Sequence, residues 1–276
     1  MAWLMTAAAG AATAWGISDF LAGLLARRLP VLTILVGSRI AAMVLALLAA
    51  AVRGLPATWD NRLWLGVAAG VVGLPAMGLL YRAMRDGTPS VVAPVAAVAA
   101  LVPVGWGVLH GERLGLGAGL GVAAGLLGAT MASWPVPSGA QHRRRRTANL
   151  CALGAALGFG IYFVLLPEAG EADQFWALAL ARITEGIGAL ILVLALRRGD
   201  RNLLRPPIVF VGLSDALADV AFLTAAVAAL APAAVVASLY PAVTLLLNRS
   251  VLRERLHTIH LYGVVAAVFS VACLAR

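Results

Sequence analysis

The sequence predicts an all-α polytopic membrane protein with ten transmembrane helices, arranged as two inverted five-helix repeats. Hydrophobic residues make up 62% of the 276 positions and charged residues only 12%, whereas soluble domains are roughly 45–50% apolar and about 25% charged. The few charges are clustered and leave long uncharged stretches, and short identities between the two halves recur in the same order. A soluble core cannot bury that apolar excess, so the composition excludes a soluble enzyme, a secreted disulfide scaffold and a disordered chain.

Each spanning helix needs about 20 mostly apolar residues. Charged and Pro/Gly breaks divide the chain at Arg27–Arg28, Arg53–Gly54, Arg82–Arg85, Gly111–Arg113, the linker 135–147, Glu168–Asp173, Arg197–Arg205, Leu230–Pro232 and Arg249–Arg255. The predicted helices are 3–26, 31–52, 63–81, 89–109, 114–133, 149–166, 174–196, 207–229, 232–251 and 258–275. The cut at Leu230–Pro232 is made because an apolar run of about 45 residues is too long for one crossing. Together the ten helices leave no soluble domain.

Arginine placement predicts the orientation, because basic residues favour the cytoplasmic side. Most arginines follow odd-numbered helices, and the opposite links hold only Arg53, Arg62, Arg113 and Arg276. Both termini are therefore expected outside the cytoplasm. The Arg143–Arg146 run lies in the longest linker, and we interpret it as a topology anchor in preference to a lipid or nucleic-acid site.

The basic linker 135–147 divides the chain into residues 1–134 and 148–276, and each part contains five predicted helices. The matching segments are Trp15-Gly16 with Phe159-Gly160, Arg39 with Arg182, Glu112-Arg113-Leu114 with Glu254-Arg255-Leu256, and Gly121-Val122 with Gly263-Val264. Because five is odd, the second repeat must enter the membrane the opposite way up. Inverted repeats are the architecture of secondary transporters, in which the substrate site lies near the midplane between the halves.

These segments give the chain a resemblance to the drug/metabolite transporter superfamily, specifically the EamA family. The residues that carry it are Trp15-Gly16-Ile17-Ser18-Asp19-Phe20, Arg39, Pro94, Pro103, Gly111-Glu112, Tyr240-Pro241 and Glu254. The resemblance implies a ten-helix bacterial protein that exports or exchanges small metabolites without ATP hydrolysis, and it names no substrate. The second repeat has Phe159 for Trp15, Phe163 near the place of Asp19 and Arg253 for Gly111, which leaves the matching roles open.

Ionisable residues inside the bilayer are costly and are candidates for function. Six are predicted there: Asp19, Arg39, Arg182, Glu185, Asp215 and Asp219. Four carboxylates face two guanidiniums, so at least one carboxylate is expected to be protonated or neutralised by a cation from the substrate. We therefore expect substrate binding or proton coupling at this cluster, and the alternative is a set of fixed ion pairs that lock the helices together.

Depth and spacing suggest how these groups pair. Asp19 and Arg39 are expected at similar depth and could pair. Helical spacing places Glu185 on the same helix face as Arg182, three residues before it. It also places Asp215 on the same face as Asp219. Glu185 and Asp215 should also lie at comparable depth. Among the carboxylates, Asp219 is the strongest candidate for function, while the two arginines are the strongest candidates for a structural role.

Aromatic side chains line many small-molecule pockets, and the candidates here are Trp15, Tyr81, Trp106, Tyr162 and Tyr240. Pro94 and Pro241 interrupt helices and are candidate gating or hinge positions. The small-residue pairs Gly66/Gly70, Gly121/Gly125 and Gly154/Gly158 are interpreted as helix contacts within the chain. No nucleotide-binding loop, zinc motif or nucleophile constellation is visible, so neither a metal nor a cofactor is expected.

The sequence therefore predicts a multi-pass transporter of a bacterial inner membrane, which exports an amino acid or amine-like metabolite by alternating access. Its expected partners are a small-molecule substrate, membrane lipid and, with proton coupling, protons, but not nucleic acid. A monomer suffices and a homodimer stays open. The alternatives are an uncoupled metabolite or nucleotide-sugar exchanger and an integral membrane enzyme or scaffold.

Overall fold

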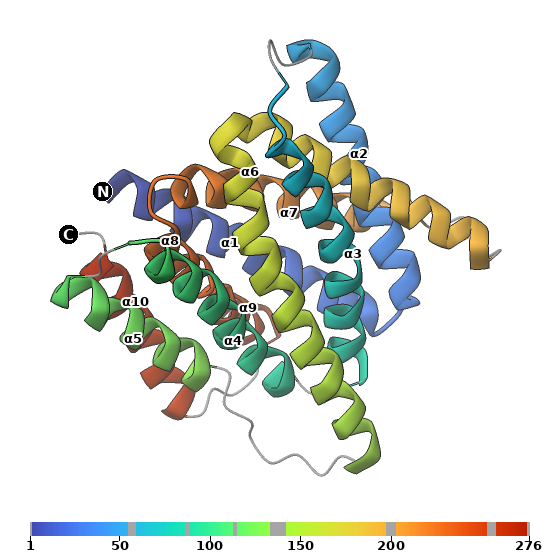
Figure 1. Cartoon of the computed structure of the whole chain (residues 1–276). Coiled ribbons are helices and arrows are strands. Elements are labelled where there is room, and N and C mark those ends of the chain that lie inside the picture. Colours follow the sequence, from blue (N-terminus) through green and yellow to red (C-terminus); the bar gives the residue numbers. More distant parts are fainter. Residues whose placement is uncertain are drawn as a thin grey trace.

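The structure, a computed structural model, describes residues 2–54, 59–86, 89–112, 115–132, 142–196, 203–252 and 258–274. Every regular element in these ranges is an α-helix, and none of the described residues forms a strand. The helices are α1 (Ala2–Ala26), α2 (Val31–Arg53), α3 (Leu63–Asp86), α4 (Pro89–Leu109), α5 (Leu116–Ala132), α6 (His142–Leu196), α7 (Pro206–Ala226), α8 (Leu230–Ala237), α9 (Tyr240–Leu252) and α10 (Thr258–Leu274). Helices from the two halves pack against each other throughout the bundle (Figure 1).

Helix α6 consists of two arms that meet at Asp173, which has an extended backbone with φ −160° and ψ 112°. The Asp173 carboxylate accepts a hydrogen bond of 3.0 Å from the Trp176 backbone N–H, as the N-cap of a helix does. Figure 1 shows the sharp bend between the first arm, residues 142–172, and the second arm, residues 174–196. The arms correspond to the predicted spans 149–166 and 174–196, but most of the predicted link between them is helical.

Several predicted boundaries need correction. The linker expected at 135–147 is helical from His142 onward, while residues 133–141 lie outside the described ranges. The predicted ninth span, 232–251, is divided into α8 and α9 by a turn at Ser238–Leu239. The third helix continues to Asp86 instead of ending at residue 81, and the eighth predicted span ends at Ala226 instead of residue 229.

Among the described residues, six helical stretches are long and apolar enough to cross a bilayer: Trp3–Ala26, Val31–Arg53, Leu63–Arg85, Leu150–Leu196, Pro206–Ala226 and Leu230–Val251. Leu150–Leu196 has 47 residues, more than twice the 20 or so that one crossing needs. Shorter apolar helices cover Ala99–Leu109, Leu116–Gly128 and Leu261–Ser270. The protein is therefore a multi-pass membrane protein, and the number of ten crossings stays a prediction.

Small residues bring the helices into close contact, while large apolar side chains such as Leu48, Leu153 and Leu217 are exposed on the outside. Lipid tails are as apolar as leucine, so helices in a membrane associate through close packing of small residues. A Cβ added to Gly66 of α3 would lie 2.7 Å from the carbonyl oxygen of Ala177 in the second arm of α6. Gly158 of the first arm packs equally closely on Ala76 of α3. These glycines therefore make contacts within the chain, as predicted.

The repeats also meet through glycines at corresponding positions. A Cβ on Gly16 of α1 would lie 2.9 Å from the Tyr240 carbonyl oxygen of α9. A Cβ on Gly160, the predicted counterpart of Gly16, would lie 3.0 Å from the Ala99 carbonyl oxygen of α4. The contact of α1 with α9 thus recurs between the first arm of α6 and α4.

A second pair of contacts follows the same rule. A Cβ on Gly70 of α3 would overlap the Ala181 carbonyl in the second arm of α6. A Cβ on Gly212 of α7 would overlap the Ser38 carbonyl of α2. Each contact joins a helix of one half to a helix of the other, and each has its counterpart after the halves are exchanged. The interior of the bundle is therefore built where the two halves meet.

Candidate functional site

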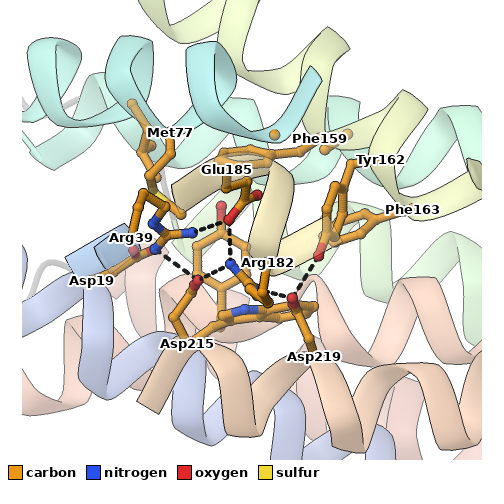
Figure 2. Close-up of a pocket in the computed structure, with 15 residues that line it drawn as sticks. Asp19, Arg39, Met77, Phe159, Tyr162, Phe163, Arg182, Glu185, Asp215 and Asp219 are labelled. Carbon is orange, nitrogen blue, oxygen red and sulfur yellow. Dashed lines mark hydrogen bonds and ion pairs between the residues drawn. The ribbon is translucent and has the colours of Figure 1, made fainter. Parts of the chain in front are cut away.

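A pocket lies at this meeting of the halves, with walls from α1, α2, α3, α4, α6, α7 and α9 (Figure 2). It is lined by Trp15, Asp19, Arg39, Gly73, Met77, Leu80, Ala99, Phe159, Tyr162, Phe163, Arg182, Glu185, Asp215, Asp219 and Tyr240. All six ionisable residues predicted inside the bilayer are among them, and none is more than 6% exposed. The pocket has about 510 Å³ of empty space, a figure that includes the part open to solvent.

Two guanidiniums and two carboxylates form a closed ring in this pocket. Arg39 lies 3.0 Å from Glu185 and 2.8 Å from Asp215. Arg182 lies 2.7 Å from Glu185 and 2.9 Å from Asp215. Figure 2 shows both arginines between the same two carboxylates. The expectation that Glu185 and Asp215 lie at comparable depth fits this ring, because each of them contacts both guanidiniums.

Asp219 is attached to the ring through Arg182, whose Nη2 contacts the Asp219 carboxylate. The Tyr162 hydroxyl donates a hydrogen bond of 2.5 Å to the same carboxylate oxygen. Tyr162 was one of the predicted pocket aromatics, and the hydroxyl gives it a polar contact as well as an apolar face. Asp219 is therefore held from both arms of α6, by a charged partner in the second arm and a neutral donor in the first.

Asp19 is the exception among the four carboxylates. It is 6% exposed and lines the pocket, yet no hydrogen bond or ion pair joins it to another described residue, and no dashed line reaches it in Figure 2. The predicted pairing of Asp19 with Arg39 is wrong, because Arg39 directs its two Nη groups to Glu185 and Asp215.

Equivalent positions of the two repeats line the pocket. The contacts of Gly70 and Gly212 fix how α3 corresponds to α7. With this register, the matching lining residues are Trp15 with Phe159, Arg39 with Arg182, Gly73 with Asp215 and Met77 with Asp219. The backbone positions correspond, but both acidic residues of α7 replace uncharged residues of α3. The pocket therefore combines a repeated framework with an uneven distribution of charge.

Gly73 makes room for the charged ring. A Cβ at this position would overlap Oε1 of Glu185 and would lie 3.2 Å from the Tyr162 ring. Any larger residue would therefore displace the carboxylate that both arginines share. No local signal in the sequence distinguishes Gly73 from the other glycines, of which the chain has 29 in all. Its position opposite Asp215 in the repeat is the one clue.

Aromatic rings form the wall beside the charges. The Trp15 ring lies 5.3 Å from that of Phe163 and 6.4 Å from that of Tyr240, measured between ring centroids. Phe222 closes the cluster at 4.9 Å from Phe163. The sequence predicted Trp15 and Tyr240 as pocket candidates but not Phe163. Its place one helical turn after Phe159 is the signal that could have found it.

Two other predicted aromatics lie elsewhere. Tyr81 is buried, at 1% exposure, but is not among the lining residues. Trp106 is 37% exposed, and its indole N–H donates a hydrogen bond of 2.7 Å to Glu168. Pro94 and Pro241 fall within α4 and α9, but their side chains lie outside the described part of the structure. Their gating or hinge role stays a prediction.

Trp106 and Glu168 line a second, more open cavity with Gly107, His110, Glu112, Pro167, Glu171 and the turn 226–230. Glu112 accepts a hydrogen bond of 3.1 Å from the Ala231 backbone N–H in the first turn of α8. This contact attaches the segment after α4 to the start of α8. Within the described residues, no group of three or more His, Cys, Asp or Glu side chains is placed to hold a metal ion.

Exposed ion pairs connect the start of α3 to the bend of α6. Arg62 lies 2.8 Å from Glu171 and 3.2 Å from Asp60. The backbone N–H and the guanidinium of Arg62 hold the pKa of Asp60 below its usual value. Arg53 makes a further pair of 2.8 Å with Asp173. These contacts share no residue with the pocket that holds the charged ring, although Glu171 also lines the second cavity.

Comparisons with known proteins agree with this architecture. The model of the EamA-like transporter family matches the chain twice, over residues 2–134 and 146–276. One solved crystal structure of a protein superposes with a TM-score of 0.70 at 16% sequence identity, and the match covers 95% of each chain. At that identity the likeness shows the fold alone. No curated protein matches the chain. The two family matches span nearly the whole sequence, and they fall on the two halves whose contacts and pocket residues correspond. The chain therefore belongs to the EamA-like transporter family, whose members are membrane transporters of the drug/metabolite type.

Proposed function

We propose that this protein is a secondary active transporter in a bacterial inner membrane, and that it exports a small amine-bearing metabolite such as an amino acid by alternating access. The observation that carries the proposal is the position of the pocket, which is lined by equivalent residues of both repeats. Sites of this kind lie between the repeats of secondary transporters, where rocking of one half against the other exposes them to each side in turn.

The charge of the pocket supports a cationic substrate group. Four carboxylates and two guanidiniums line it, so full ionisation leaves an excess of negative charge away from water. An unpaired carboxylate in such surroundings costs several kcal/mol. A substrate ammonium group would remove that cost, and the neighbouring rings of Trp15 and Tyr240 offer faces to its apolar part.

A proton would remove the same excess, because protonation also neutralises a carboxylate. Proton and amine would then exclude each other from the pocket, and entry of the proton would drive export of the amine. The alternative is an uncoupled exchanger that uses the same pocket with no dependence on pH. Both versions keep the substrate in this pocket and differ in what returns through it.

The test is thermal stabilisation of the purified protein by amino acids, amines, nucleosides and organic anions, at mildly acidic and at neutral pH. A ligand at 100 times its Kd should stabilise the protein by about 2.7 kcal/mol. A cationic or zwitterionic ligand with a pH-dependent effect supports coupling. An anionic ligand without pH dependence contradicts the proposed substrate class and points instead to Arg39 and Arg182.

A matched pair of variants ties binding to the pocket. Met77→Trp fills the pocket from α3, whereas Leu217→Trp adds similar bulk at a side chain that is 64% exposed on α7. Met77→Trp should abolish the stabilisation by ligand, and Leu217→Trp should keep it. Equal binding by both variants would place the substrate elsewhere and overturn the proposal.

A further inference from the structure

Asp19 differs from the other pocket carboxylates in having no partner among the described residues. Glu185 and Asp215 each contact both arginines, and Asp219 contacts Arg182 and Tyr162. Asp19 is also buried, at 6% exposure, and it lines the same cavity. A buried charge is normally paired, since leaving it unpaired costs free energy. The pocket therefore contains one carboxylate that is free to take an outside partner.

Among the described residues, the surroundings of Asp19 provide no cation that is not already paired with other carboxylates. The described charged and titratable groups that interact electrostatically with it are Arg39 of α2, Tyr81 of α3, Asp215 of α7 and Tyr240 of α9. Arg39 is the one cation in this set, and its guanidinium already contacts two other carboxylates. The remaining groups are neutral phenols or a second carboxylate.

Aromatic faces lie beside this carboxylate. Trp15 is one helical turn before Asp19 on α1, so both side chains are on the same face of the helix. The rings of Trp15 and Tyr240 stand edge to face, with centroids 6.4 Å apart, and both line the pocket. A carboxylate next to aromatic faces suits an organic ammonium ion, which gains an ion pair and a cation–π contact at once.

We propose that Asp19, with Trp15 and Tyr240, forms the subsite for the ammonium group of a small organic amine. In this assignment the ring of Arg39, Arg182, Glu185 and Asp215, with Asp219 attached, stays paired whether the pocket is empty or filled. The subsite rests on the proposed function in one respect, because it places the substrate in this pocket. It goes further by naming the residue that binds the substrate charge and by excluding the five other charged residues of the pocket from direct contact with the ammonium group.

The subsite has a consequence for the ligand-free protein. Asp19→Asn removes an unpaired buried charge and should therefore leave the melting temperature unchanged or raise it. Asp215→Asn removes a partner of both arginines and should lower it. A marked fall in the melting temperature of Asp19→Asn would show that Asp19 is a structural ion-pair partner and would overturn the proposal.

The binding test uses ethyl-, butyl-, benzyl- and phenethylammonium, each compared with the alcohol of the same carbon skeleton. The ammonium ions, but not the alcohols, should stabilise the wild-type protein. Asp19→Asn should weaken ammonium binding by at least about 30-fold, the lower end of what loss of a buried charge partner costs. Asp19→Glu should retain part of it, and Asp60→Asn, which removes an exposed carboxylate outside the pocket, should retain all of it.

The same assay separates this subsite from the pocket as a whole. If Asp19→Asn binds ammonium ions as the wild type does while Met77→Trp does not, the pocket is the binding site and the role of Asp19 is refuted. If both variants bind normally, the pocket itself is refuted as the site. Failure of all four ammonium ions to stabilise the wild-type protein also overturns the assignment, because a free buried carboxylate beside aromatic rings should bind at least one of them.

Discussion

Arg182 is expected to be the most sensitive charged residue for stability, because it contacts three buried carboxylates. It lies 2.7 Å from Glu185 and 2.9 Å from Asp215, and it also contacts Asp219. Arg182→Met leaves Glu185 and Asp215 with Arg39 as their remaining cation. Of its partners among the described residues, Asp219 would lose the Arg182 guanidinium and keep just the hydrogen bond from the Tyr162 hydroxyl. One carboxylate thus becomes an uncompensated buried charge.

The expected loss follows from that count. Removal of one partner of a buried ion pair typically lowers the free energy of unfolding by about 3–5 kcal/mol, and we expect Arg182→Met to fall in this range. Because the orphaned group is Asp219, the double variant Arg182→Met/Asp219→Asn should recover a large part of the loss. The asparagine remains able to accept the hydrogen bond from Tyr162.

Reversible unfolding in mixed micelles, followed by circular dichroism or tryptophan fluorescence, measures both effects. Arg62→Met is the matched control, since Arg62 also contacts two carboxylates but is 49% exposed, and exposed ion pairs contribute little. The reasoning is refuted if Arg182→Met costs no more than Arg62→Met. It also fails if the added Asp219→Asn change recovers nothing, because the cost would then not arise from an orphaned carboxylate.

Two further changes test a close helix contact and a helix cap. Gly212→Ala should destabilise the fold strongly, because the new methyl group would overlap the Ser38 carbonyl of α2. Gly10 has open space around it, so Gly10→Ala should be neutral or slightly stabilising. Equal melting temperatures of the two variants would contradict the close contact at Gly212. Asp173→Ala should lower the free energy of unfolding by about 1 kcal/mol through loss of the helix cap, and it should increase hydrogen exchange at the first backbone amides of the second arm of α6. Asp173→Asn can still cap the helix and should lose less stability. Unchanged exchange at those amides in Asp173→Ala would contradict the capping role.

Much of the fold follows from local signals in the sequence. The second predicted helix, 31–52, agrees with α2 within one residue, because Pro30 and Gly54 mark its ends and Gly54 has a positive φ of 80°. The bend at Asp173 could not be predicted in detail. Polar residues there indicate the membrane surface, but they do not show that a single extended residue with a capping carboxylate is enough to reverse the chain.

The membership of the site was predictable, while its pairing was not. Hydropathy selects the charged residues that lie at bilayer depth, and all six line the pocket. Depth in the bilayer does not tell which helices are neighbours. Similar depth on consecutive helices therefore suggested an ion pair between Asp19 and Arg39. The glycine contact of α7 with α2 instead brings Asp215 to Arg39. Which helices pack closely depends on small residues far apart in the chain. Small residues are so common in this sequence that the local pattern does not show which of them make the contacts.

The uneven charges of the two repeats also mean that neither half could build this pocket as a homodimer. Two copies of the first repeat would bring together two Arg39 side chains without Glu185 or Asp215 to hold them. Two copies of the second would put an aspartate in the place of Gly73, where Glu185 leaves no room even for a methyl group. The halves are complementary rather than interchangeable, and their covalent fusion keeps them in the one-to-one ratio that the pairing of charges requires.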